Sequence, residues 1–103
     1  MMIIFSVTPF GVGEHLSTQV AKAIAIVRES GLPYQLTPMG TIIEGEWEPV
    51  MAVIDRCRLT LLEECPRVAI KIWIDDKKGV TDSMTAKIES VRAKIGEVHT
   101  SPG

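Results

Sequence analysis

Three residues, Pro38, Met39 and Gly40, separate two short stretches that read as β-strands, residues 34–37 and 41–44. Proline lacks a backbone donor and glycine lacks a side chain, so both favour a tight turn over a continuous strand. A crossover between parallel strands needs a dozen residues or more. The two strands are therefore expected to be antiparallel neighbours, and a purely parallel sheet is excluded.

Two longer segments alternate between the two sides of a strand. Residues 2–8 place Ile3, Phe5 and Val7 on one side, and residues 67–75 alternate over their whole length. A period of two residues is typical of a strand that buries one face. Both segments are therefore predicted to be strands.

Three other segments repeat their apolar residues every three or four positions, which predicts amphipathic helices. The first spans residues 17–30, and Ser17 is suited to cap its start. The second has Pro49 in its first turn, where a missing donor costs little. Its apolar stripe consists of Val50, Val53, Ile54, Cys57 and Leu61. The third spans residues 82–95, and its inward residues are expected to be Met84, Ile88, Val91 and Ile95.

The resulting order is βαββαβ followed by an additional C-terminal helix, an α+β class. With right-handed crossovers, this order matches a ferredoxin-like fold with an antiparallel four-stranded sheet and its two main helices on one face. A chain of 103 residues fits one domain. We expect residues 1–96 to form that domain and residues 97–103 to form a flexible tail.

The sheet face away from the helices is predicted to be partly apolar. Its residues are expected to be Ile4, Ser6, Thr8, Ala69, Lys71 and Trp73. Ile4 and Trp73 are poorly suited to contact with water. Self-association of two copies through this open face is therefore expected.

Composition and spacing argue against several classes of function. The net charge of −2 argues against a nucleic-acid partner. The start of the chain resembles neither a signal peptide nor a membrane span, which predicts a cytoplasmic protein with reduced cysteines. The segment 11–16 has Leu16 where a dinucleotide-binding loop has its third glycine. The histidines and cysteines lack the spacing of a zinc site, and no catalytic set can be assembled, so we predict no metal, no cofactor and no catalytic residue.

Small and hydroxyl-bearing residues are predicted to gather at one end of the sheet. The first strand should be antiparallel to both neighbours, so its end should lie beside the beginnings of the third and fourth strands. Glycine allows a ligand to approach the backbone, and a threonine hydroxyl both donates and accepts hydrogen bonds. Each residue alone is typical of an ordinary turn or strand, but together they predict a pocket for a small polar heterocycle. The predicted ligand-binding residues are Thr8, Pro9, Gly11, Gly13, Ser17, Thr37, Met39 and Thr41.

Three segments resemble the small thiamine-binding protein family. They are GLPYQLTPMGTIIEGE at 31–46, SVTPFG at 6–11 and RVAIKI at 67–72, and the likeness extends over nearly all of residues 2–95. LTPMGT is the most specific of these motifs. The resemblance implies a ferredoxin-like fold, dimers and tetramers that assemble through the sheets, and binding of thiamine or its hydroxymethylpyrimidine portion without an established catalytic activity.

A thiamine ligand would give these residues distinct roles. Hydroxyls of Thr8, Thr37 and Thr41 would bind the aminopyrimidine, with Met39 and Pro9 as apolar walls. The approach surface would be formed by Gly11, Gly13 and Ser17.

The predicted function is non-enzymatic binding of the vitamin or its pyrimidine, for buffering, sensing or delivery. Two alternatives stay open: a small enzyme that acts on a related heterocycle at an oligomer interface, and an assembly module without a ligand. The thiazolium cation of thiamine favours a carboxylate or an aromatic ring. Glu44 and Trp47 offer these groups, but at the far end of the third strand, where they would serve only a neighbouring subunit.

Overall fold

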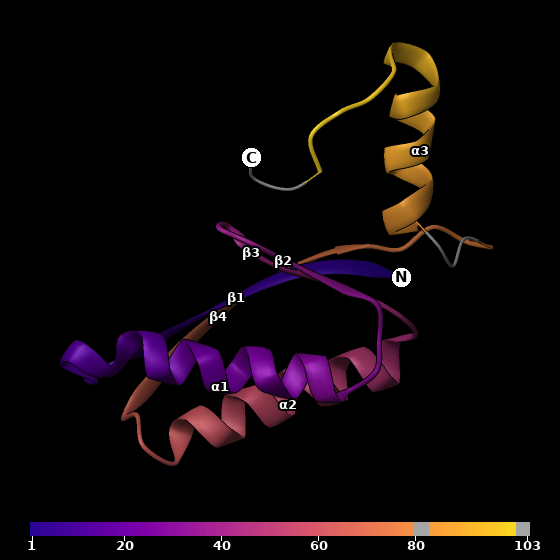
Figure 1. The fold of residues 1–103 in the computed structure, drawn as a ribbon. Coiled ribbons are helices and arrows are strands. Elements are labelled where there is room, and N and C mark those ends of the chain that lie inside the picture. The colour runs from indigo at the N-terminus through magenta and orange to yellow at the C-terminus, as the bar shows by residue number, and fades with distance from the viewer. Residues whose placement is uncertain (80–82, 101–103) are drawn as a thin grey trace.

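One antiparallel sheet with the strand order β2-β3-β1-β4 organises the fold (Figure 1). The computed structural model describes residues 1–79 and 83–100. Its strands are β1 (Met2–Phe10), β2 (Tyr34–Thr37), β3 (Gly40–Glu44) and β4 (Arg67–Asp75). β1 lies between β3 and β4 and is antiparallel to both, as the sequence predicts.

Two helices cover one face of this sheet, and a third lies on the other side (Figure 1). The covering helices are α1 (Leu16–Glu29), which follows a short 3₁₀ turn η1 (Gly13–His15), and α2 (Trp47–Leu62). The third helix is α3 (Ser83–Ile95). This arrangement confirms the predicted α+β class and the ferredoxin-like βαββαβ order with its additional helix.

The hydrophobic core lies between the sheet and the two covering helices. Ile3 and Phe5 of β1 and Ile43 of β3 are at most 2% exposed. The predicted stripe of α2 is confirmed, because all five of its residues are buried. Each large apolar side chain buried in this way contributes roughly 1.5–3 kcal/mol.

The start of α1 differs from the prediction. The helix begins at Leu16, so Ser17 lies inside the first turn and makes no capping hydrogen bond, and the predicted cap is wrong. The 3₁₀ turn has already wound the chain before Ser17 is reached. At the other end, Gly31 has a φ of +76°, the left-handed conformation with which glycine commonly ends a helix.

Helix α3 contacts the domain mainly near its first turn. The backbone N–H of Met84 donates to Glu44 Oε2 at 3.0 Å, and Lys87 Nζ lies 2.7 Å from Asp75 Oδ2. Farther along, the helix stands away from the sheet (Figure 1). Its predicted inward face is therefore wrong at two positions.

Those two positions are Val91, 47% exposed, and Ile95, 72% exposed. Asp82, where this helix was expected to begin, lies outside the described residues, as does the end of the predicted tail. Earlier in that tail, the carbonyl of Thr100 accepts a hydrogen bond of 3.1 Å from Gln35 Nε2 on β2.

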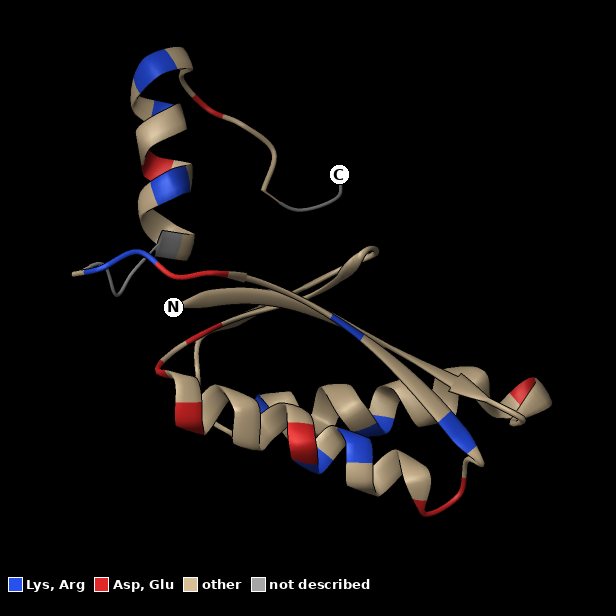
Figure 2. Ribbon diagram, turned by 180° about the vertical axis from the view of Figure 1, so that it is seen from behind, with Lys and Arg blue, Asp and Glu red and all other residues tan. Residues whose placement is uncertain are grey.

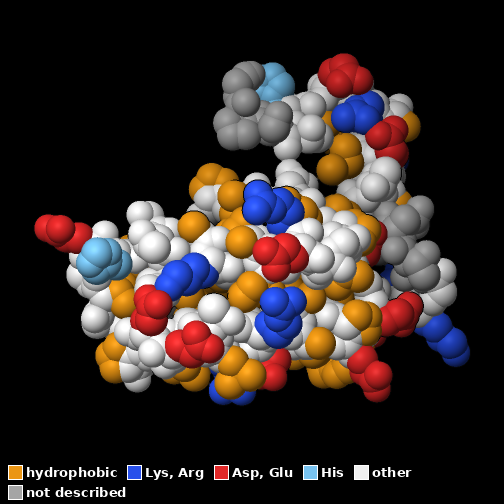
Figure 3. All heavy atoms as spheres, turned by 60° about the horizontal axis from the view of Figure 1, so that its bottom comes forward, with side chains coloured by type: hydrophobic (Ala, Val, Ile, Leu, Met, Phe, Trp, Pro, Cys, Tyr) orange, Lys and Arg blue, Asp and Glu red, His pale blue; other side chains and the backbone are white. Residues whose placement is uncertain are grey.

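The open sheet face carries the predicted residues. Trp73 on β4 pairs with Ile4 on β1 and is 74% exposed. β1 itself carries no charged side chain (Figure 2). On the face that Figure 3 shows, acidic and basic side chains are interspersed and no broad basic patch is formed. Within the described residues, no helix combines the length and apolar character that spanning a membrane requires.

Candidate functional site

The β2–β3 hairpin is fixed by the hydroxyl of Thr37. This hydroxyl donates to the carbonyl oxygen of Gly40 at 2.7 Å and accepts from the backbone N–H of Met39 at 3.2 Å. Its single proton is therefore used inside the turn, and only acceptor capacity is left for a ligand. Thr37 primarily shapes the hairpin.

Gly40 lets the hairpin pack tightly on β1. Its φ is +155°, and a Cβ at this position would lie 2.9 Å from the carbonyl oxygen of Phe5 and 3.0 Å from Cγ1 of Ile4. No side chain fits there unless the hairpin moves away from β1. The glycine of the LTPMGT motif is therefore needed for a close approach between strands.

A small cavity lies between the hairpin and α1, and we call it the hairpin cavity. Its volume is about 160 Å³. The residues that line it are Phe5, Ser6, Val7, Val20, Ile24, Leu36, Thr37, Pro38, Met39, Gly40 and Thr41. Thr41 is among them and is only 3% exposed. Met39, at 84% exposed, is available to cover whatever enters.

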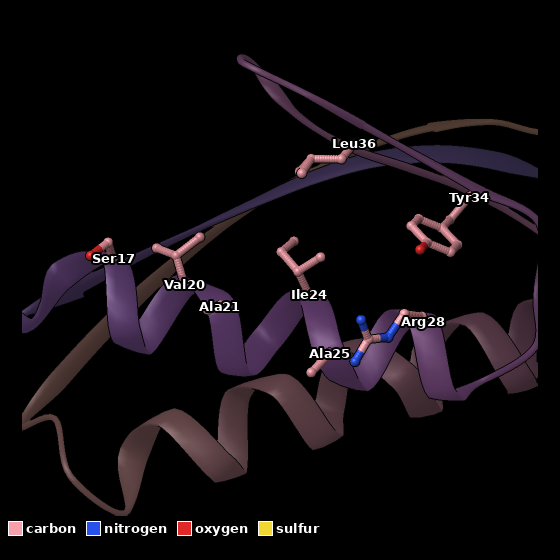
Figure 4. A pocket seen from close by; sticks show the side chains of 8 residues that line it. All are labelled: Ser17, Val20, Ala21, Ile24, Ala25, Arg28, Tyr34 and Leu36. Atoms are coloured by element: carbon pink, nitrogen blue, oxygen red, sulfur yellow. The ribbon is translucent and has the colours of Figure 1, made fainter.

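A larger groove adjoins the hairpin cavity, and we call it the α1–β2 groove (Figure 4). Its volume is about 540 Å³, and it shares Val20, Ile24 and Leu36 with the hairpin cavity. The remaining lining residues are Ser17, Ala21, Ala25, Arg28 and Tyr34. Figure 4 shows Leu36 and Tyr34 directed from β2 toward α1, with Ser17 at one end of the groove and Arg28 at the other. The two hollows form one continuous surface with an apolar middle.

Only part of the predicted site lies together. Thr37, Met39 and Thr41 line the hairpin cavity, and Ser17 lines the adjoining groove. Gly11 instead borders a third cavity of about 300 Å³. The other residues that line this third cavity are Val12, His15, Thr18, Gln19 and Glu64.

The last three predicted residues, Thr8, Pro9 and Gly13, belong to the described chain but line none of these three cavities. The register explains the separation. Thr41 pairs with Phe5, whereas β1 continues with β4 as far as Phe10, about 16 Å farther along. Thr8 also points to the open face beside Ala69.

Sequence reasoning missed several residues of this surface. Val20 and Ile24 belong to the apolar repeat that predicts the helix over residues 17–30, and they were not predicted as ligand-binding residues. Arg28 continues their series at intervals of four residues, which places all three on one side of α1. That spacing is the signal in the sequence that could have identified Arg28.

The lining residues are suited to binding rather than to proton transfer. They supply hydroxyls and one arginine, and none of those named is a carboxylate, histidine or cysteine that could act as a general base. Cys57 lies in the core, where burial raises the pKa of its thiol to about 11. Among residues 1–79 and 83–100, no three His, Cys, Asp or Glu side chains group as a metal site requires.

Comparison with known proteins identifies the family. The model of the thiamine-binding protein family matches residues 3–92. The chain belongs to the thiamine-binding protein family. Nearly the whole described domain lies inside this match, including the hairpin cavity and the α1–β2 groove.

Relatives of known sequence or structure agree with this membership. A UPF0045 protein of Mycobacterium bovis is 47% identical over 92 residues, covering 88% of this chain and 90% of its own. A solved structure from Methanocaldococcus jannaschii superposes with a TM-score of 0.79 at 26% identity, covering 87% of this chain and 93% of its own.

A Thermotoga maritima structure, named as a candidate thiamine biosynthesis/salvage protein, has a TM-score of 0.73. It covers 84% of this chain and 94% of its own. At 24% identity, it supports the fold alone.

Proposed function

We propose that this protein binds thiamine or its hydroxymethylpyrimidine portion without catalysing a reaction, and buffers, senses or delivers the ligand in the cytoplasm. The pyrimidine ring occupies the hairpin cavity, which adjoins the α1–β2 groove. Family membership supports the ligand class. No carboxylate, histidine or cysteine is found among the described residues that line the two hollows, which supports binding without turnover.

The single observation that carries this proposal is the hydroxyl of Thr41. Thr41 is only 3% exposed and lines the hairpin cavity, so a ring that enters this cavity would lie against it. An aminopyrimidine offers both a donor and ring-nitrogen acceptors, so it matches a hydroxyl that can donate and accept. Val20 and Ile24 would contact the faces of the ring, and Met39 would close over it.

Self-association through the open sheet face is part of the proposal. Trp73 is 74% exposed there, beside the partly buried Ile4. Two copies that pair these faces as a dimer, or two dimers as a tetramer, would remove apolar surface from water. The hairpin cavity borders α1 on the other face of the sheet, so such pairing leaves it open.

Isothermal titration calorimetry tests the ligand. The full chain is titrated with thiamine and with hydroxymethylpyrimidine, alongside the variants Thr41→Val and Thr60→Val. Thr60 lies on α2 and lines neither hollow, so it controls for the loss of a threonine hydroxyl. We expect saturable binding that weakens about tenfold in Thr41→Val and is unchanged in Thr60→Val, since one lost hydrogen bond is worth about 1 kcal/mol or more.

Absence of binding for both ligands would reject the proposal and favour an assembly module. Equal binding by all three proteins would place the ligand elsewhere. Chromatography of the ligand after prolonged incubation addresses the enzymatic alternative, because a new product would show turnover.

A further inference from the structure

Arg28 and Tyr34 converge at one end of the α1–β2 groove. Figure 4 shows the Tyr34 ring directed from β2 toward the Arg28 side chain on α1. Among the described residues, neither the Arg28 guanidinium nor the Tyr34 hydroxyl forms a hydrogen bond or ion pair. Both are donors that remain available to a ligand.

The charge at this end selects against a cation. Among the described residues that line the two hollows, Arg28 alone is charged and no carboxylate offsets it. A thiazolium placed in the groove would meet a like charge. A phosphoryl group would instead accept paired hydrogen bonds from the guanidinium, the contact for which arginine is best suited.

The distance to the ring site fits a short ligand. Leu36 pairs directly with Thr41, and Tyr34 follows two residues away on the same side of β2. Two residues along a strand span about 7 Å. One pyrimidine ring with a phosphate on its hydroxymethyl group covers such a span without any intervening second ring.

We infer that the preferred ligand is the phosphate ester of hydroxymethylpyrimidine, with its ring at Thr41 and its phosphoryl group at Arg28 and Tyr34. This inference rests on the proposed function, because it uses the same ring site. It adds that affinity depends on an anionic group at the other end of the groove.

A second role for Arg28 must be separated in the test. A basic residue in the last turn of a helix also interacts favourably with the helix dipole. Such a role would change the stability of α1 but not the choice between ligands. The test therefore compares two ligands within each variant, together with the melting temperature of each variant.

Calorimetry with hydroxymethylpyrimidine, its phosphate ester, thiamine and inorganic phosphate provides the test. The proteins are the full chain, Arg28→Gln, Tyr34→Phe and Arg56→Gln, the last being an exposed arginine of α2 that lines neither hollow. We expect the ester to bind at least tenfold more tightly than the free alcohol, with higher salt reducing the difference. Arg28→Gln should abolish the preference, Tyr34→Phe should reduce it, and Arg56→Gln should retain it.

The outcomes separate the two proposals. Equal affinity for ester and alcohol, or a preference that survives Arg28→Gln, overturns the inference while the pyrimidine site stands. Inorganic phosphate that binds as tightly as the ester also overturns it, because the ring would then add nothing. Absence of binding by every pyrimidine ligand overturns both proposals.

Discussion

Replacing Gly40 with alanine tests how the hairpin is seated on the sheet. The φ of +155° is strained for any residue with a Cβ, which costs roughly 1–3 kcal/mol. The added Cβ would also lie 2.9 Å from the carbonyl oxygen of Phe5. Since Phe5 belongs to the central strand, the hairpin must move instead, and a weakened ladder hydrogen bond adds about 1 kcal/mol. The expected loss in unfolding free energy is therefore about 2–4 kcal/mol.

Gly31→Ala is the matched control. Gly31 also has a positive φ, at +76°, but a Cβ there would meet nothing within 4 Å. Only the backbone strain applies, which is worth about 1–2 kcal/mol for an L-residue in this region. The difference between the two variants therefore reports the contact with β1 together with any difference in backbone strain between the two φ values.

Urea unfolding at a fixed protein concentration, followed by circular dichroism, provides the measurement. For a domain of this size, each kcal/mol corresponds to about 4–8 °C in melting temperature, so the Gly40 variant should also melt well below the Gly31 variant. Equal losses in the two variants would refute the claim that Gly40 is required by its contact with Phe5. Because the hairpin lines the ring site, ligand affinity should fall in Gly40→Ala only.

Three further results are expected. Trp73→Glu should lower the mass measured by light scattering, whereas Leu59→Glu on the helix side should not; an unchanged mass for Trp73→Glu would reject pairing through the open face. Cys57, with its pKa raised to about 11 by burial, should react with a thiol reagent at neutral pH only after unfolding, and rapid labelling of the native protein would contradict its burial. Hydrogen bonds from Lys22 and Gln19 lower the pKa of Glu64 in the native protein. The stability that this carboxylate contributes above about pH 4.5 is therefore lost as the pH falls through the lower native pKa. Glu64→Gln should make the free energy of unfolding depend less on pH across this range, and an unaltered pH dependence would exclude the effect.

The helices and strands can be predicted from the sequence because the buried side of each one repeats its apolar residues at a regular interval. Ile3 and Phe5 alternate with residues of the open face, and Val50, Val53 and Ile54 follow one side of a helix. These local patterns do not say how far two paired strands overlap. β3 ends its pairing with β1 at Phe5, and the loop at Gly11 is consequently too distant to join the hairpin. The predicted site residues of the hairpin therefore lie together, whereas those farther along β1 lie apart from them.

Thr37 and Thr41 show the same limit at the level of single hydroxyls. Both flank the turn, and the sequence treats them alike. Register places Thr37 opposite Gly40 and Thr41 opposite Leu36, so their side chains point to opposite faces. The hydroxyl of Thr37 donates its hydrogen bond within the turn, to the carbonyl oxygen of Gly40. Thr41 instead lines the hairpin cavity from the core side of the sheet.

Helix α3 shows that the spacing of apolar residues predicts a helix but not its packing partner. The spacing of Met84, Ile88, Val91 and Ile95 predicts a helix with one apolar side, and a helix is present. The pattern does not identify what that side packs against. The carboxylate of Glu44 accepts a hydrogen bond from the backbone N–H of Met84 in the first turn of the helix. These residues are 40 positions apart, so no local sequence pattern predicts the contact.

The groove exists because the helices do not cover the sheet to its edge. Tyr34 pairs with Ile43 and Leu36 pairs with Thr41, so both β2 side chains belong to the core side of the sheet. Ile43 is fully buried there, yet Leu36 is 58% exposed and Tyr34 is 37% exposed. A flat ring beneath β2 would complete this layer and bury apolar surface that the protein alone leaves in water. Ligand binding should therefore stabilise the native state, and the gain should grow with affinity for each ligand as mass action requires.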